Sequence, residues 1–190
     1  MTIIDSHIEK AFVQIKECFE NNGKLLICGN GGSSADCDHI VGELAKGFEK
    51  KRTLNEVDKN KFLNIDLKFN TNFADKLQYG LPVFSLTSHA ALMTAIINDI
   101  GSDYIFAQQV WALGKPGDVL LSISTSGNSK NIINACLVGR SKKLKNIGLT
   151  GSNEGKLESV CDLIIKSKEK SVAKIQEEHI KIYHYLCRKL

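Results

Sequence analysis

Short apolar runs alternate along the chain with longer segments in which apolar residues recur every three or four positions. The short runs have the length of buried strands, and the longer segments have the periodicity of amphipathic helices. A repeated order of strand, short polar loop and helix is typical of a parallel sheet covered by helices on both faces. The predicted strands are 24–28, 83–86, 119–123, 146–150 and 162–165, and the predicted helices are 4–19, 35–47, 88–100 (with Thr87 or Ser88 as N-cap), 105–113, 130–141 and 172–189.

The segment 50–80 departs from this alternation. It is polar, rich in Lys and Asn, and only weakly periodic. A structureless loop of that length is unusual inside a compact domain. We therefore expect one domain over residues 1–190, with an insertion at about 50–80 that is partly helical or hairpin-like and lies over the surface or near a site.

The composition of the 190 residues, 43% hydrophobic and 24% charged, is that of a globular protein. No apolar run reaches the roughly 18 residues of a membrane span, and the N-terminus lacks the features of a signal peptide. The net charge is +4, and the lysines are spread along the chain rather than grouped. This distribution indicates a solvated surface, so we expect neither a nucleic acid nor a membrane as partner.

The six cysteines lie far apart and form no C-x-x-C pair. A chain of this size needs no disulfide framework, and the spacing does not suit a zinc finger. We therefore expect buried free thiols and a cytoplasmic location. The cysteines are Cys18, Cys28, Cys37, Cys136, Cys161 and Cys187.

Two polar loops, 29–34 and 124–129, each follow a predicted strand and open a predicted helix. A helix N-terminus offers unpaired N–H groups and a positive dipole end, which suits a phosphate, and Ser and Thr hydroxyls add donors. Neither loop is complete as a dinucleotide fingerprint or a Walker A loop, so NAD and ATP are not indicated. Tight turns with serine N-caps are the alternative interpretation.

His39 and Glu43 lie four residues apart on the helix after the first loop and so share one face. A carboxylate beside an imidazole suits proton transfer or metal binding, although an exposed surface pair is the simpler alternative. The C-terminal helix carries Gln176 and His184 two turns apart on roughly one side, about 12 Å along the axis. We expect the intervening His179 at the surface.

Four motifs, taken in order, resemble the phosphoheptose isomerase family of sugar-isomerase (SIS) domain proteins. They are Gly29-Asn30-Gly31-Gly32-Ser33, Asn98-Asp99, Ser124-Thr125-Ser126-Gly127-Asn128-Ser129, and Ile175-Gln176-Glu177 followed by His184. The resemblance implies a doubly wound, flavodoxin-like α/β fold and a homotetramer with active sites at subunit interfaces. It also implies the aldose–ketose isomerisation of sedoheptulose 7-phosphate to D-glycero-D-manno-heptose 7-phosphate, the first step toward activated heptose.

The resemblance also implies roles for individual residues. Glu43 matches the catalytic base and His184 the acid. Positions that would bind the sugar are Asn30, Gly31, Gly32, Asn98, Asp99 and Gln176, and positions that would hold the phosphate are Ser124, Thr125, Ser126 and Ser129. In members that bind Zn²⁺ the ligands match His39, Glu43, Gln176 and His184. Because Glu43 would then be both base and ligand, we treat these two roles as partly exclusive states.

Two other functions stay open at this point. One is a non-catalytic SIS protein, either an adaptor that binds a replication initiator or a regulatory domain that senses a sugar phosphate. An adaptor has no physical need for the pair of Glu43 and His184, so these residues favour an enzyme. The other is an isomerase of a different phosphosugar, which would be favoured if the insertion at 50–80 reshapes the pocket.

Overall fold

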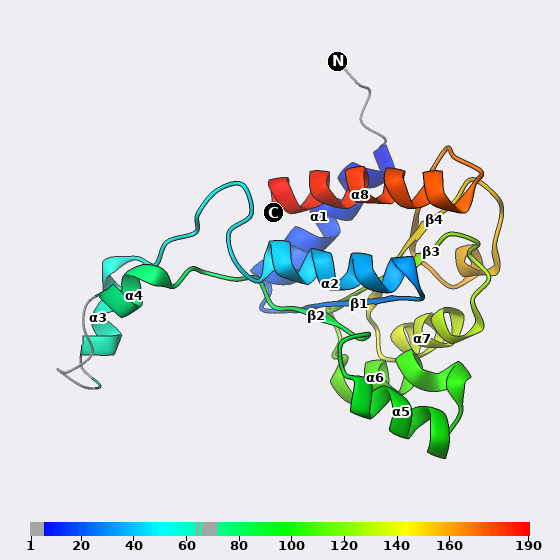
Figure 1. The fold of residues 1–190 in the computed structure, drawn as a ribbon, viewed down its shortest axis with the longest axis horizontal. Coiled ribbons are helices and arrows are strands. Elements are labelled where there is room, and N and C mark those ends of the chain that lie inside the picture. The colour runs from blue at the N-terminus through cyan, green and yellow to red at the C-terminus, as the bar shows by residue number, and fades with distance from the viewer. Residues whose placement is uncertain (1–5, 64, 66–71) are drawn as a thin grey trace.

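The strands form one parallel five-stranded sheet in the order β2-β1-β3-β4-β5 (Figure 1). The computed structural model describes residues 6–63, 65 and 72–190. Its strands are β1 (Leu25–Gly29), β2 (Val83–Ser85), β3 (Val119–Ser124), β4 (Lys145–Thr150) and β5 (Leu163–Lys166). This strand order is that of a flavodoxin-like, doubly wound fold, so the predicted fold class is confirmed.

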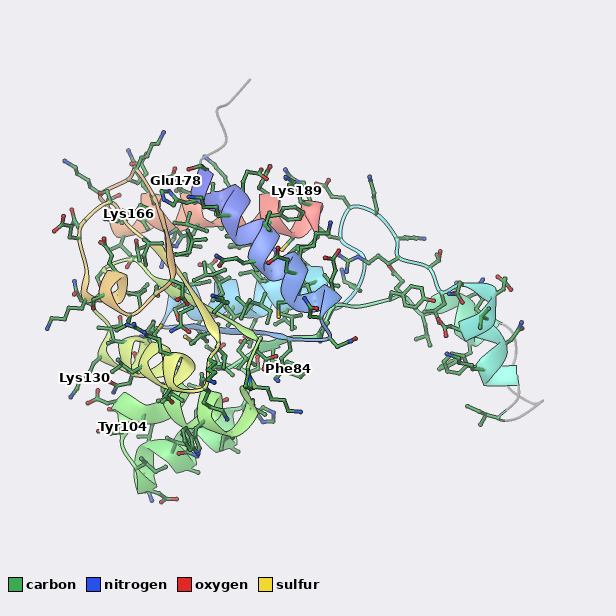
Figure 2. All side chains as sticks on the ribbon, turned by 180° about the vertical axis from the view of Figure 1, so that it is seen from behind. Phe84, Tyr104, Lys130, Lys166, Glu178 and Lys189 are labelled. Atoms are coloured by element: carbon green, nitrogen blue, oxygen red, sulfur yellow. The ribbon has the colours of Figure 1, made fainter. Side chains whose placement is uncertain are left out.

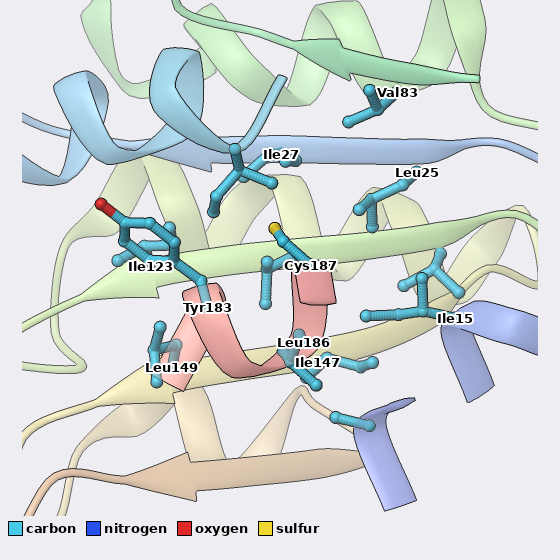
Figure 3. Packing of buried hydrophobic residues seen from close by; sticks show 14 of the residues in the cluster. Ile15, Leu25, Ile27, Val83, Ile123, Ile147, Leu149, Tyr183, Leu186 and Cys187 are labelled. Atoms are coloured by element: carbon cyan, nitrogen blue, oxygen red, sulfur yellow. The ribbon is translucent and has the colours of Figure 1, made fainter. Parts of the chain in front are cut away.

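Helices cover both faces of the sheet. The α-helices that pack on it are α1 (Ser6–Glu20), α2 (Gly32–Leu44), α5 (Ala90–Asp99), α6 (Ile105–Leu113), α7 (Lys130–Ser141) and α8 (Val172–Lys189), and two short 3₁₀ helices are η1 (Ser102–Tyr104) and η2 (Lys156–Ser159). Successive side chains of a strand point to opposite faces. In β1, Leu25 and Ile27 accordingly pack with α1, α2 and α8, whereas Leu26 and Cys28 pack with α5, α6 and α7. Figure 3 shows the first of these two clusters.

Helix boundaries at two places differ from the sequence prediction. The helix after the first polar loop spans Gly32–Leu44 rather than about 35–47: the chain turns helical within the glycine-rich stretch, and Ala45 is the C-cap. The N-cap of α5 is His89, so the prediction of Thr87 or Ser88 as N-cap was wrong. The hydroxyls of both residues instead bond to Asp38 of α2, at 3.2 and 2.6 Å, and thereby join the loop after β2 to α2. Ile4, at the start of the predicted first helix, is outside the described residues.

The segment 50–80 contains two short helices, α3 (Glu56–Leu63) and α4 (Asn72–Lys76), which project away from the sheet (Figure 1). An isolated antiparallel bridge between Thr53 and Gln78 brings the two ends of this segment together. The Phe62 and Phe73 rings pack edge to face with centroids 5.6 Å apart. Residues 64 and 66–71 of the predicted insertion are outside the described residues.

Several surface charges form ion pairs. Lys130, Lys166 and Lys189 lie on three separate elements (Figure 2) and bind Asp103, Glu158 and Glu9 at 2.6, 2.8 and 2.7 Å. Of the cysteines, five are buried free thiols and Cys161 is half-buried, which confirms the prediction of free thiols. No helix within the described part of the chain is long and apolar enough to cross a bilayer.

We expect Asp118→Ala to lower the free energy of unfolding by about 2–4 kcal/mol. The buried Asp118 carboxylate accepts hydrogen bonds from the backbone N–H of Lys24 at 2.9 Å, from the Lys24 ammonium at 2.5 Å and from the backbone N–H of Lys115 at 2.7 Å. Alanine would leave all three donors without this partner where β1 and β3 begin. Urea denaturation measures the loss, and Asp75→Ala, which removes only an exposed ion pair with Lys59, is the control. Equal stability of the two variants would contradict the prediction.

Candidate active site

The two polar loops meet at the carboxyl edge of the sheet. β1 and β3 are neighbours, and the chain leaves them toward opposite sides of the sheet, which is the switch point where ligands bind in such folds. The side-chain amides of Asn30 and Asn131 exchange two hydrogen bonds of 2.9 and 3.0 Å and so tie the first loop to α7. A cavity of about 180 Å³ opens between the loops, lined by Asn30, Ser33, Ile123, Ser124, Thr125, Ser129, Ile132, Val172 and Gln176.

The hydroxyls of the second loop are arranged around the N-terminus of α7. Ser129 is the N-cap residue, yet its hydroxyl makes no capping bond and lies 3.4 Å from the hydroxyl of Ser124. Ser124 accepts a hydrogen bond from the N–H of Gly127 at 3.2 Å, and the exposed Ser126 accepts one from the N–H of Asn128 at 3.2 Å. Hydroxyls and a helix N-terminus around one cavity form a site suited to an anion.

Two glycines shape the first loop. Gly31 has a φ of 57°, a conformation that favours glycine over residues with a Cβ. Gly32 begins α2 so close to α8 that an added Cβ would collide with the side-chain amide of Gln176. The absence of a side chain at Gly32 therefore lets Gln176 reach the cavity between the loops.

His39, Glu43 and His184 come together farther along α2 and α8. The His39 Nε2 atom lies 3.2 Å from Glu43 Oε1 and 3.5 Å from His184 Nε2. The Glu43 side chain is 15% exposed, and its Oε2 is buried without a hydrogen-bond partner in the described part of the chain. The Phe48 ring packs against the His184 ring, with centroids 5.4 Å apart. The helical spacing thus placed His39 beside Glu43 as predicted, and α8 adds His184.

Sequence reasoning missed Tyr183 and Asp36, which lie beside this group. The Tyr183 hydroxyl donates to Asp36 Oδ1 at 3.2 Å and lies 2.9 Å from His39 Nδ1. Burial raises the pKa of the Asp36 carboxyl and also that of the Tyr183 hydroxyl. The sequence carried a weak signal for Asp36, which precedes His39 by three residues and so shares its helix face. Tyr183 follows directly after Ile182 in the apolar stripe, where an aromatic residue is typical of a core.

His179 is fully buried, so the expectation of a surface position was wrong. Its Nε2 lies 3.1 Å from the carbonyl oxygen of Thr150 at the end of β4. Burial lowers the pKa of this imidazole, and its Nδ1 has no hydrogen-bond partner among the residues described. His179 therefore connects α8 to the sheet instead of facing solvent.

Asn98 and Asp99 are not brought to the cavity in the single chain. Both are exposed at the end of α5, and the Asn98 amide donates to Asp99 Oδ1 at 2.7 Å. Neither lines the cavity between the two polar loops.

The zinc ligands implied by the resemblance are only partly assembled. His39, Glu43 and His184 have the donor types that zinc takes. Gln176, in contrast, lies two helical turns before His184 and lines the cavity between the loops. Over residues 6–63, 65 and 72–190, no three His, Cys, Asp or Glu side chains are grouped as ligands of one metal ion. Within the single chain, the four side chains that the resemblance implies as zinc ligands are therefore not gathered around one point. Binding of Zn²⁺ stays a prediction.

Known proteins resemble this chain over most of its length. A family model described as SIS domain matches residues 3–57 and 70–151, and its gap falls within the segment 50–80. The phosphoheptose isomerase of Rhodospirillum rubrum is 39% identical over 165 residues, which are 87% of this chain and 74% of that protein. The phosphoheptose isomerase of Aliarcobacter butzleri is 38% identical over 181 residues, 95% of this chain and 82% of that protein.

Solved structures agree with the sequence matches. A phosphoheptose isomerase from Francisella tularensis superposes with a TM-score of 0.80 at 32% identity and covers 99% of this chain and 86% of that one. The phosphoheptose isomerase from Neisseria gonorrhoeae gives a TM-score of 0.78 at 33% identity, over 98% and 86% of the two chains. Since the family model, the sequence matches and the structural matches all agree, the chain belongs to the phosphoheptose isomerase family of SIS-domain proteins.

Proposed function

We propose that this chain is an aldose–ketose isomerase that converts sedoheptulose 7-phosphate to D-glycero-D-manno-heptose 7-phosphate. The observation that carries the proposal is the arrangement of α2 and α8, which lie side by side and run in the same direction (Figure 1). Gln176 of α8 lines the cavity between the polar loops and lies against Gly32 at the start of α2. Glu43 and His184 lie farther along the same helices. A substrate with a phosphate at one end and a carbonyl at the other fits a site of this kind.

The reaction moves a proton between C1 and C2 through an enediol and needs a base and an acid. In the proposed mechanism, Glu43 removes the proton from carbon, and the half-buried His184 donates a proton to the carbonyl oxygen. The proton held by Glu43 then adds to the neighbouring carbon, while the hydroxyl on the first carbon gives its proton to His184 and becomes the aldehyde. The hydroxyls of the loop 124–129 and the N-terminus of α7 hold the phosphate and so fix which carbons face Glu43.

The test is to incubate the purified protein with sedoheptulose 7-phosphate in D₂O and to follow C1 and C2 by NMR. Formation of the aldose, or deuterium at either carbon, is the expected result. A folded protein that gives neither, with Zn²⁺ supplied as well as without it, would contradict the proposal. That outcome would favour a different phosphosugar or a non-catalytic SIS protein, and a thermal-shift screen of sugar phosphates would follow.

We further propose a homotetramer with active sites at subunit interfaces and a cytoplasmic location. Two features support the interface. Asn98 and Asp99 match sugar-binding positions of the family but lie outside the cavity of their own chain. The same stretch exposes the apolar side chains of Leu92, Ile97 and Ile100. Buried free thiols are consistent with a reducing compartment.

We expect Ser126→Ala to raise KM for the sugar phosphate about tenfold or more while kcat changes little. A hydrogen bond to a charged group contributes roughly 1.5–3 kcal/mol. Ser126 is exposed and does not line the cavity itself, but it belongs to the loop whose Ser124, Thr125 and Ser129 do. Steady-state kinetics with sedoheptulose 7-phosphate measure the effect. Ser141→Ala, at the far end of α7, is the matched control. An unchanged KM in Ser126→Ala would count against phosphate binding by this loop.

A further inference from the structure

Two buried polar groups, Asp36 and Tyr183, form a hydrogen-bonded series that ends on the imidazole of His39. Asp36 and His39 are three residues apart on α2, and Tyr183 reaches them from α8. The Tyr183 hydroxyl lies 3.2 Å from Asp36 Oδ1 and 2.9 Å from His39 Nδ1. Tyr183 is 1% exposed, and its ring packs among apolar side chains (Figure 3). Its hydroxyl is therefore a fixed partner for His39 rather than a mobile one.

The hydrogen-bond pattern sets which ring nitrogen of His39 faces the catalytic groups. With Nδ1 held by Tyr183, the other nitrogen, Nε2, lies 3.2 Å from Glu43 Oε1 and 3.5 Å from His184 Nε2. The His39 side chain is 43% exposed, so packing against neighbouring side chains does not by itself prevent a 180° flip of the ring. A ring flip would exchange each nitrogen with a ring carbon and so place a carbon next to Glu43.

We propose that Tyr183, held in place by Asp36, is a positioning residue that fixes the ring of His39 with Nε2 directed at Glu43 and His184. The inference rests on the function proposed above for the same site. Tyr183 itself does not touch the substrate. It acts through His39, which in turn holds the Glu43 carboxylate and the His184 imidazole at their present separation.

Tyr183→Phe isolates the hydroxyl, because phenylalanine keeps the ring that packs edge to face on both His39 and His184, at centroid distances of 5.4 and 5.1 Å. We expect kcat to fall about tenfold, as for the loss of one buried hydrogen bond, while KM stays within about twofold. The matched control is Tyr185→Phe, which removes a hydroxyl on the same helix that donates to Glu9, away from the site. This control should keep the kcat of the unmodified protein.

The second readout does not depend on turnover. In protein labelled with ¹⁵N-histidine, His39 is one of five histidines, and its ring nitrogens are assigned by their loss in His39→Asn. We expect Tyr183→Phe to shift the balance between the Nδ1–H and Nε2–H tautomers of His39, and Tyr185→Phe to leave it unchanged. Asp36→Asn should shift it in the same direction as Tyr183→Phe, and the double variant should add little to Tyr183→Phe alone.

An unchanged His39 tautomer in Tyr183→Phe, together with kcat within twofold of the unmodified protein, would overturn the inference. If Tyr183→Phe is unfolded, Asp36→Asn provides the same two measurements, and normal values of both would again overturn it. If the unmodified protein shows no isomerase activity, the proposed function fails, but the NMR measurement still decides whether Tyr183 fixes His39.

Discussion

Glu43→Gln lowers kcat for the isomerisation by about 10²–10⁴-fold and leaves KM almost unchanged, as expected for the loss of a general base. Glutamine has the same size as glutamate and can keep a contact with His39 Nε2, but its amide does not accept the proton from carbon. The Oε2 of Glu43 is buried and has no hydrogen-bond partner among the described residues, so no protein donor competes there for the proton. Measurement of kcat and KM, with circular dichroism to confirm the fold, checks the prediction.

The control for this variant is Glu49→Gln, which changes an exposed carboxylate that pairs with Arg188 at 2.7 Å. We expect it to keep normal kcat, because Glu49 lies outside the proposed proton-transfer group. Deuterium exchange into the substrate gives a second measurement, since loss of the base stops exchange as well as turnover. Near-normal exchange in Glu43→Gln would show that another residue removes the proton.

His184→Asn is expected to lower kcat by about 10²-fold or more, again with little change in stability. Asparagine can occupy the same region but does not donate and recover a proton near neutral pH. His184 is only half-buried in α8, and its ring contacts His39 and Phe48, so its removal leaves no large cavity. Kinetics and thermal unfolding of the purified variant distinguish loss of catalysis from loss of fold.

Arg188→Gln, one turn farther along α8, is the control for His184→Asn. It removes an exposed ion pair with Glu49 and should change neither kcat nor the midpoint of unfolding by a measurable amount. If His184→Asn kept turnover close to that of this control, His184 would not be the acid. The proton on the carbonyl oxygen would then have to come from His39 or from solvent.

Local patterns predicted most of the elements. The helices 105–113, 130–141 and 172–189 have the predicted bounds, because a continuous apolar stripe and flanking turn residues are properties of the segment itself. The strands were found within two residues, since buried parallel strands are short apolar runs. The start of α2 was missed because glycines are weak helix formers, although here Gly32 is needed for close contact with Gln176.

His179 shows where the local pattern was insufficient. It lies on the same helix face as Ile175 and Ile182, so periodicity was compatible with burial, but a polar side chain favoured the surface. Its burial is stabilised by a hydrogen bond with the carbonyl of Thr150, 29 residues away in the sequence. A partner on another element cannot be identified from helical spacing.

The same distinction holds for the candidate site. The sequence alone predicts that the two polar loops lie at strand ends, because each loop directly follows an apolar run. It also predicts that His39 contacts Glu43, because residues four apart share one face of a helix. Long-range packing of α8 on α2 brings Tyr183 and His184 to His39 across 144 and 145 residues of sequence. These contacts depend on how the apolar faces of α2 and α8 pack on one sheet. Because hydrophobic burial is non-directional, the sequence pattern alone does not specify which residues of two remote helices come into contact.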